Sequence, residues 1–338
     1  MGARGTGAGM VSQLRKGWLS MDIVCVGILV ADVLSSPIES MPAAGELRLT
    51  DRIFTNIGGC AANAAVDLVR LGRSVTVAGK VGKDQFGDFV VQELERHGID
   101  ISAVRRSETH STSATQIVNV RGQDRRFIHA FGANADFTLA DIDTAILDGA
   151  RLLYLGGYLV MPGFSADHLT QLFREAKRRG LITVLDVVVP AGVKGTMEEA
   201  LGSALPYTDA FLPNDDEARA LTGKQHPREQ AEAFARLNPN CTIVITQGRT
   251  GALAKRGDEV LQAGIYRMES IDGSGAGDAF DAGFFVGLLE GWPLEETLRF
   301  ASAVGASCTR ALGTTAGVFT FDEAVAFIKQ NPLDIQRL

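Results

Sequence analysis

Residues 271–278 have the composition of a loop that binds a phosphate group. The segment reads Ile-Asp-Gly-Ser-Gly-Ala-Gly-Asp, and an apolar helical pattern follows it directly. Glycine and alanine let the backbone approach a bulky anion, and a helix that begins there directs its free N–H groups at the anion. The carboxylate of Asp278 could accept a proton from a hydroxyl group that attacks the phosphorus. The segment therefore predicts phosphoryl transfer to a hydroxyl group, with a plain glycine-rich turn before a helix as the alternative.

The composition indicates a globular protein without a nucleic-acid or membrane partner. Of 338 residues, 46% are hydrophobic and 22% charged, and the net charge is −7. An acidic balance argues against polyanionic partners, and the apolar runs are too short to span a membrane. Four scattered cysteines lack the paired spacing of a zinc site. We expect Cys25, Cys241 and Cys308 to be buried free thiols of a cytoplasmic protein.

The chain divides into a short extension and one long α/β domain. Residues 1–20 are glycine-rich and lack the apolar core of a secretory signal, so we expect a disordered N-terminal extension. Residues 21–332 alternate strand and helix patterns, which is typical of a mostly parallel sheet with helices on both faces. The predicted strands are 22–29, 75–81, 152–155, 181–188, 210–212 and 242–246, and the predicted helices are 59–71, 86–97, 166–179, 215–221, 228–237 and 276–289.

Two segments interrupt this alternation. Residues 47–57 and 113–131 alternate apolar with polar residues, and a turn is predicted at 121–124. They are typical of half-exposed antiparallel strands, which we place in insertions at about 36–57 and 112–131. An insertion near the carboxyl ends of a parallel sheet can close over a ligand as a lid, while a hairpin without function is the alternative.

Polar residues follow the first strand and open the first helix. Asp32 comes after strand 22–29, and Gly58, Gly59 and Asn63 lie where the helix over 59–71 begins. Ligands bind at the carboxyl ends of parallel strands, and carboxylate and amide groups hydrogen-bond well to sugar hydroxyls. A loop-capping aspartate and a first-turn asparagine are the structural alternatives.

A second group of polar residues suits a magnesium nucleotide. Asn214 and Glu217 follow strand 210–212 and could orient the waters of a Mg²⁺ ion. Residues 246–251 (TQGRTG) follow strand 242–246 and suit phosphate contact, although a tight turn explains their glycines equally well. The P-loop pattern is absent and no glycine cluster follows the first strand, which argues against Walker-type nucleotidases and dinucleotide-dependent oxidoreductases.

These motifs together resemble the ribokinase-like (PfkB-type) carbohydrate kinases over about residues 21–330. The C-terminal signature of that family usually reads D-T-x-G-A-G-D, and residues 272–278 read DGSGAGD. Its N-terminal signature of paired glycines and an asparagine matches Gly58, Gly59 and Asn63. The supporting matches, in order, are PAAGE (42–46), VGKDQFG (81–87), GANA (132–135), the N-x-x-E pair at 214 and 217, and the T-x-G turn at 246–248.

The resemblance implies an ATP-dependent sugar kinase with a three-layer αβα sandwich, a mostly parallel central sheet and a small inserted β-sheet lid. Asp278 would be the catalytic base, and the N–H groups of Gly275, Ala276 and Gly277 would form the anion hole. The resemblance also implies sugar binding by Asp32, Gly58, Gly59 and Asn63, and Mg²⁺ and ATP binding by Asn214, Glu217, Thr246, Gly248 and Gly251. In many members, the residue that matches Asp272 and carbonyl groups that match those near 310–313 help to bind K⁺. In many members the lid strands also form a homodimer contact.

Several positions depart from strict ribokinases. Cys60 stands where they carry lysine after the paired glycines, and residues 154–158 hold no acid where they carry glutamate. Gly273 replaces the first threonine of the signature and adds backbone freedom beside the expected cation site. The frequent D-x-N-x-R segment reads DVVVP at 186–190, without its asparagine and arginine.

Two alternative functions remain open. A nucleoside kinase of the same family would be favoured by a stacking aromatic pair in the lid cleft, formed by Phe131 or Phe137 with Tyr158. A non-catalytic sugar-binding relative is the other alternative, although it would not need both the base and the anion hole. The identity of the acceptor depends on lid residues whose geometry the sequence does not give.

Overall fold

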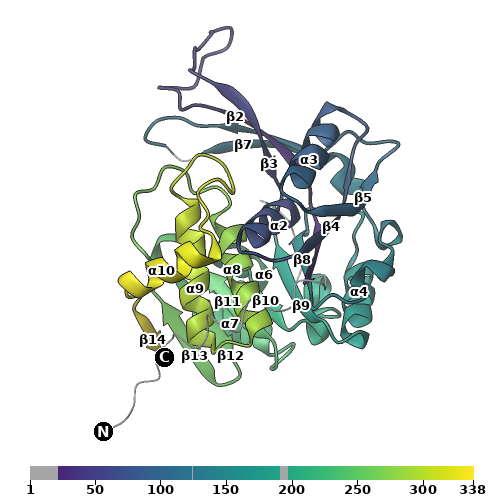
Figure 1. The fold of residues 1–338 in the computed structure, drawn as a ribbon, viewed down its shortest axis with the longest axis vertical. Helices are drawn as coiled ribbons and strands as arrows, with labels where there is room; N and C mark the ends of the chain where they lie inside the picture. Colours follow the sequence, from purple (N-terminus) through teal and green to yellow (C-terminus); the bar gives the residue numbers. More distant parts are fainter. Residues whose placement is uncertain (1–21, 124, 191–196) are drawn as a thin grey trace.

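A large central sheet and a small second sheet organise the chain. The structure is a computed structural model that describes residues 22–123, 125–190 and 197–338. A ten-stranded sheet runs through the centre, and a four-stranded sheet projects beyond its end (Figure 1). The expected extension of residues 1–20 lies outside the described residues.

The central sheet is parallel except at one edge. Its order is β14-β13-β12-β11-β10-β9-β8-β1-β4-β5, and pairing is parallel from β11 to β5 and antiparallel from β11 to β14. The parallel strands are β1 (Ile23–Gly27), β4 (Val75–Val81), β5 (Asp100–Arg106), β8 (Leu152–Tyr158), β9 (Ile182–Val187), β10 (Ala210–Phe211) and β11 (Thr242–Thr246). The edge strands are β12 (Ala252–Arg256), β13 (Glu259–Ala263) and β14 (Ile335–Arg337), the last of which lies beyond the expected domain end at residue 332.

Helices cover both faces of this sheet, which makes the fold a three-layer αβα sandwich. Alternate residues of β1 face opposite sides: Ile23 and Cys25 join one hydrophobic cluster, and Val24 and Val26 join the other. The first cluster includes α2 (Cys60–Arg70), α3 (Gln85–Arg96), α8 (Ala276–Glu290), α9 (Leu294–Cys308) and α10 (Phe321–Gln330). The second includes α4 (Ala166–Arg178), α5 (Met197–Leu201), α6 (Asp215–Thr222) and α7 (Pro227–Ala235). The predicted fold class is confirmed.

The four-stranded sheet has the order β3-β2-β6-β7 and is referred to below as the lid sheet. Its strands are β2 (Val30–Ser35), β3 (Ile53–Gly58), β6 (Ala114–Val118) and β7 (Arg126–Ala130). The β2/β3 and β6/β7 pairs are antiparallel, as predicted, while β2 and β6 pair in parallel. The predicted turn at 121–124 connects β6 to β7, and its fourth residue lies outside the described residues.

The lid sheet differs from the sequence prediction at two places. We predicted no strand between residue 29 and residue 47, but the chain enters β2 at Val30. The predicted strand over 47–57 begins only at Ile53, because β2 is six residues long and pairs only with 53–58. Leu47 and Leu49 lie outside the pairing and are 84% and 83% exposed. Alternation alone therefore overestimates a strand whose partner is short.

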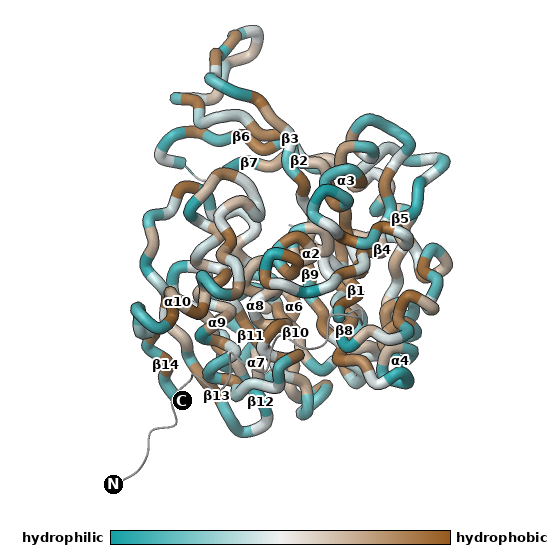
Figure 2. The backbone as a smooth tube through the Cα atoms, in the orientation of Figure 1, coloured by the Kyte–Doolittle hydropathy of each residue, from teal (hydrophilic) through white to brown (hydrophobic). Residues whose placement is uncertain are grey.

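Hydrophobic residues lie mainly in the strands of the central sheet and in the helices packed on it (Figure 2). Cys25, Cys241 and Cys308 are buried and unpaired, which confirms the prediction for these thiols. Among the described residues, no helix combines the length and apolar character needed to cross a bilayer.

Candidate active site

The loop at 272–278 leads into an uncapped helix. Gly275 occupies the N-cap position of α8 with φ +74°, and a Cβ atom there would lie 2.2 Å from the carbonyl oxygen of Thr314. Glycine is therefore required at this position. No described side chain caps α8, and a Cβ on Gly277 would meet no atom within 4 Å. The N–H of Ala276 donates a long hydrogen bond of 3.4 Å to the carbonyl of Gly273, and the open space lies beside Gly277, at a helix start where an anion can bind.

Asp278 lies in the first turn of α8 and is held by a residue of α2. The side-chain amide of Asn63 donates a hydrogen bond of 2.8 Å to Oδ2 of Asp278. Burial raises the pKa of Asp278 to about 6, and hydrogen bonds from Asn63 and Cys60 partly oppose this rise. A carboxylate with this pKa is ionised at neutral pH yet basic enough to accept a proton.

Asp32 is brought to the same site by the lid sheet. It lies on β2 and is buried; its register partner Thr115 on β6 also hydrogen-bonds to its side chain. A Cβ on Gly58 would lie 2.2 Å from Oδ2 of Asp32, so a larger residue there would displace the Asp32 carboxylate. Burial raises the pKa of Asp32 to about 6; the Thr115 hydrogen bond lowers it and the charge of Asp278 raises it. Gly59 then turns the chain into α2 with φ +92°.

Further acidic groups surround Asp278. The carboxylates of Asp186 and Asp278 and the thiol of Cys60 offer ligand atoms within 4.8 Å of one another. Burial raises the pKa of Glu217 to about 7, and the charges of Asp278 and Asp216 raise it further against two backbone hydrogen bonds. Burial and nearby carboxylates likewise raise the pKa of Asp186. Bringing these groups together costs energy that a bound cation would offset.

A cavity of about 770 Å³ lies at the start of α6. Its lining residues include Asn214, Thr246 and Gly248 of the predicted nucleotide site, together with Arg125. Asn214 and Glu217 form a reciprocal capping box at the start of α6, with both hydrogen bonds 2.9 Å long. This capping box is a structural role for both residues, and it also fixes both side chains at the edge of the site.

Gly251 does not line this cavity among the described residues. It has φ +104°, and a Cβ there would lie 1.9 Å from the carbonyl oxygen of Ala263. The requirement for glycine at this position is thus explained by the close approach of β12 to β13. Its predicted nucleotide contact stays a prediction.

Arg125 was missed by the sequence analysis. It precedes β7 in the lid sheet, yet its Nη1 donates a hydrogen bond of 3.1 Å to Oδ1 of Asp272, and it also donates to the hydroxyl of Ser274. The partners are 147 residues apart along the chain, so no local pattern could signal the contact. Asp186 was noted only as part of a family motif, although it lies near the carboxyl end of β9, at the same sheet edge as the other site residues.

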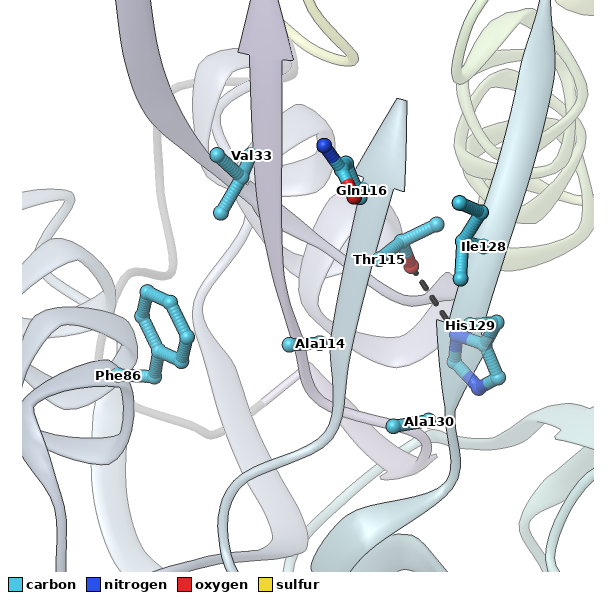
Figure 3. A pocket seen from close by; sticks show the side chains of 8 residues that line it. All are labelled: Val33, Phe86, Ala114, Thr115, Gln116, Ile128, His129 and Ala130. Carbon is cyan, nitrogen blue, oxygen red and sulfur yellow. Dashed lines mark hydrogen bonds between the residues drawn. The ribbon is translucent and has the colours of Figure 1, made fainter. Parts of the chain in front are cut away.

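The two faces of the lid sheet differ. Thr115 and His129 are register partners joined by a hydrogen bond of 3.0 Å (Figure 3), and they share a face with Asp32. Val33 and Ile128 belong to the opposite face, where a hollow of about 310 Å³ has a largely apolar lining that includes Phe86 of α3 (Figure 3). The face with Thr115 and His129 is thus the one that carries Asp32 toward Asp278.

The aromatic pair that would favour a nucleoside acceptor is not formed. Phe137 is fully buried and stacks on Phe164 with ring centroids 5.7 Å apart. Tyr158 is buried and donates a hydrogen bond to the carbonyl of Ala200. Both rings belong to the core cluster beneath the sheet, while Phe131 contacts His129 instead.

Comparisons with known proteins point to one family. The model of the pfkB family carbohydrate kinases matches residues 20–320. The chain is 26% identical over 299 residues to the ATP-dependent 6-phosphofructokinase of Thermoanaerobacterium thermosaccharolyticum, covering 86% of this chain and 89% of that protein. It is 26% identical over 318 residues to the 5-dehydro-2-deoxygluconokinase of Clostridium beijerinckii, covering 89% and 92%. The structure of Arabidopsis thaliana ribokinase complexed with ribose and ATP superimposes with a TM-score of 0.77 at 24% identity, covering 92% of this chain and 99% of that one.

Proposed function

The chain belongs to the pfkB family of carbohydrate kinases, and we propose that it transfers the γ-phosphoryl group of ATP to a hydroxyl of a small carbohydrate with Asp278 as the base. The observation that carries this proposal is the position of Asp278. Its carboxylate lies at the start of an uncapped helix, is held by Asn63 and is electrostatically coupled to Asp32. A proton acceptor, an anion-binding helix start and a hydroxyl-binding carboxylate thus occur together.

In this mechanism the acceptor binds under the lid sheet. Asp32 and Asn63, beside the backbone of Gly58 and Gly59, hydrogen-bond to its hydroxyl groups, and Asp278 takes the proton of the attacking hydroxyl. The N–H groups of Gly275, Ala276 and Gly277 stabilise the negative charge of the transferring phosphoryl group. The lid sheet excludes water, which favours transfer to the sugar over hydrolysis.

The residues at the site edge fit a magnesium nucleotide. Mg²⁺ prefers carboxylate and phosphate oxygens and keeps several waters, and the clustered carboxylates of Glu217 and Asp186 suit such a loosely held ion. When bound, Mg²⁺ neutralises phosphate charge. Thr246 and Gly248 line a cavity of about 770 Å³, a volume within the range of small-molecule sites, and would contact the nucleotide.

We also infer a homodimer formed through the lid sheet. Ile53 and Ile128 lie on the face opposite Asp32 and are 70% and 65% exposed. Exposed apolar side chains on one sheet face favour association with a second copy, which sedimentation velocity would detect. Use of ATP and four unpaired cysteines suit a cytoplasmic location.

An acceptor screen tests the proposed function. ADP release would be measured with Mg²⁺-ATP and pentoses, hexoses, sugar acids, sugar phosphates and nucleosides. We expect turnover with one class of sugar and little without an acceptor. Turnover with nucleosides alone would support the nucleoside kinase alternative. ATP binding without transfer to any acceptor would support the non-catalytic alternative.

The pH dependence of kcat/KM should report the ionisation of Asp278. The base must be ionised, so kcat/KM is expected to rise with pH through about 6 and then level off. Asn63→Leu removes a donor that favours the charged carboxylate, so the pKa of Asp278 and the rising limb should move to higher pH. Measuring kcat/KM against pH for the wild type and Asn63→Leu on the best acceptor tests this. A rising limb that moves to lower pH in Asn63→Leu would contradict it.

A further inference from the structure

Asp272 is engaged by donors from the protein itself. Its Oδ1 accepts hydrogen bonds from the N–H of Ser274 at 2.9 Å, from the hydroxyl of Ser274 at 2.8 Å and from Nη1 of Arg125 at 3.1 Å. Its Oδ2 accepts one from the N–H of Gly313 at 3.0 Å. The Asp272 side chain is only 4% exposed. A K⁺ ion would compete for these same oxygen atoms.

Carbonyl groups near residues 310–313 and in the loop at 272–278 also accept hydrogen bonds from the protein. The side chains of Arg310 and Cys308 both donate to this loop region. Their acceptors are the carbonyl oxygens of Ser307 and Gly317 for Arg310, and those of Ser274 and Thr314 for Cys308. A carboxylate and carbonyls that already accept guanidinium, thiol and amide donors are a poor donor set for a monovalent cation. The carboxylate expected to bind K⁺, that of Asp272, is thus already paired with a guanidinium and hydrogen-bonded on both oxygens, so the expected K⁺ site does not fit at Asp272.

Arg125 places a permanent positive charge at this position. A Cβ on Gly273 would lie 3.8 Å from its Nη2, so the guanidinium lies close to the loop at 272–278. Arg125 also lines the cavity of about 770 Å³, so its charge lies between Asp272 and the proposed nucleotide site. Arg125 precedes β7 of the lid sheet and is 147 residues from Asp272 along the chain.

We propose that Arg125 takes the place of the monovalent cation in this protein. Paired with Asp272 and Ser274, its guanidinium holds the loop at 272–278 in its anion-binding shape, and turnover is independent of K⁺. Arg125 acts here as a positioning residue, through the loop. The inference rests on the proposed function because turnover is one of its readouts.

The test compares activity in K⁺ and in tetramethylammonium, which is too large for a K⁺ site. The wild-type kcat should differ by less than about twofold between the two cations. Arg125→Ala should lower kcat by roughly 10²-fold in tetramethylammonium, because the loop loses its alignment, and K⁺ should restore part of the loss. Arg125→Lys should keep more activity than Arg125→Ala and remain insensitive to K⁺. Arg126→Ala, a neighbour that donates to Gln123 in the same hairpin, is the matched control and should behave as wild type.

A second readout does not depend on turnover. With Mg²⁺-ADP bound, K⁺ should leave the Tm of the wild type unchanged and raise the Tm of Arg125→Ala. The inference would be overturned if K⁺ raised the kcat of the wild type by more than about tenfold. It would also be overturned if Arg125→Ala in tetramethylammonium had the same kcat as the wild type. A protein that phosphorylates no acceptor would instead refute the proposed function, and the Tm response would still decide the role of Arg125. If Arg125→Ala fails to fold, the K⁺ dependence of kcat in the wild type and in Arg125→Lys decides the role of Arg125.

Discussion

Asp278→Asn is expected to lower kcat by about 10²- to 10⁴-fold, the usual contribution of a general base. Asparagine has nearly the same shape but cannot take the proton of the acceptor hydroxyl. Asp278 is half-buried at the start of α8, so the fold should tolerate the change. ADP release on the best acceptor measures the loss, and calorimetric ATP binding and Tm measure whether the rest of the protein is intact.

Asp281→Asn is the matched control for this experiment. Asp281 lies one turn further along α8 and is buried, and burial with neighbouring carboxylates raises its pKa. The substitution replaces a buried carboxyl group of the same helix, at a position without a proposed role in proton transfer, by an amide of the same shape. We expect its kcat to stay within a few-fold of wild type. Wild-type turnover in Asp278→Asn would exclude Asp278 as the base.

Gly275→Ala is expected to disturb both the helix start and the catalysis that depends on it. Its φ of +74° is costly for alanine, and the new Cβ would lie 2.2 Å from the carbonyl oxygen of Thr314. Either the loop at Thr314 or the start of α8 must move. We expect a loss of about 1–3 kcal/mol in the free energy of unfolding and a fall of roughly 10²-fold in kcat. Denaturant unfolding and ADP release measure the two effects.

Gly277→Ala is the control for Gly275→Ala, because it also replaces a glycine but introduces no steric contact. Gly277 lies in the first turn of α8, and a Cβ there meets no atom within 4 Å. Its free energy of unfolding should therefore match or slightly exceed that of the wild type, because alanine favours helix. If Gly275→Ala is as stable and as active as the wild type, Gly275 does not shape the anion hole.

The difference between these two glycines shows how far a motif can be interpreted. Both belong to the same signature, and the sequence gives them the same role. Only the neighbouring loop distinguishes them, because the carbonyl of Thr314 approaches Gly275 and not Gly277. Gly251 is a similar case, because the carbonyl oxygen of Ala263 approaches it so closely that glycine is required there.

The lid sheet is the part of the site that the sequence predicted least well. The alternating pattern identified β6 and β7, but β2 was missed because it follows β1 after only two residues. That omission hid the pairing of Asp32 with Thr115 on one face of the sheet. Sheet register depends on partners from distant segments, which a single strand does not specify.

The sequence by itself determined the features that depend on neighbouring residues. Glycine-rich turns before a helix, the Asn214–Glu217 capping box and the alternation of strands and helices all follow from local conformational preferences. The fold class and the carbohydrate kinase family follow from these patterns in order. Polar residues after parallel strands could also be expected to meet, because those strand ends share one edge of the sheet.

The tertiary structure alone decided which groups meet and what their environment does to them. The raised pKa of Asp278 comes from burial, and burial depends on helices packed from distant segments. The aromatic rings of Phe137 and Tyr158 were assigned to the core, away from any lid cleft. Arg125 reaches Asp272 because the lid sheet folds over the helix start. Such contacts join residues far apart in the chain, so they arise from packing of the whole domain and have no signal in local sequence.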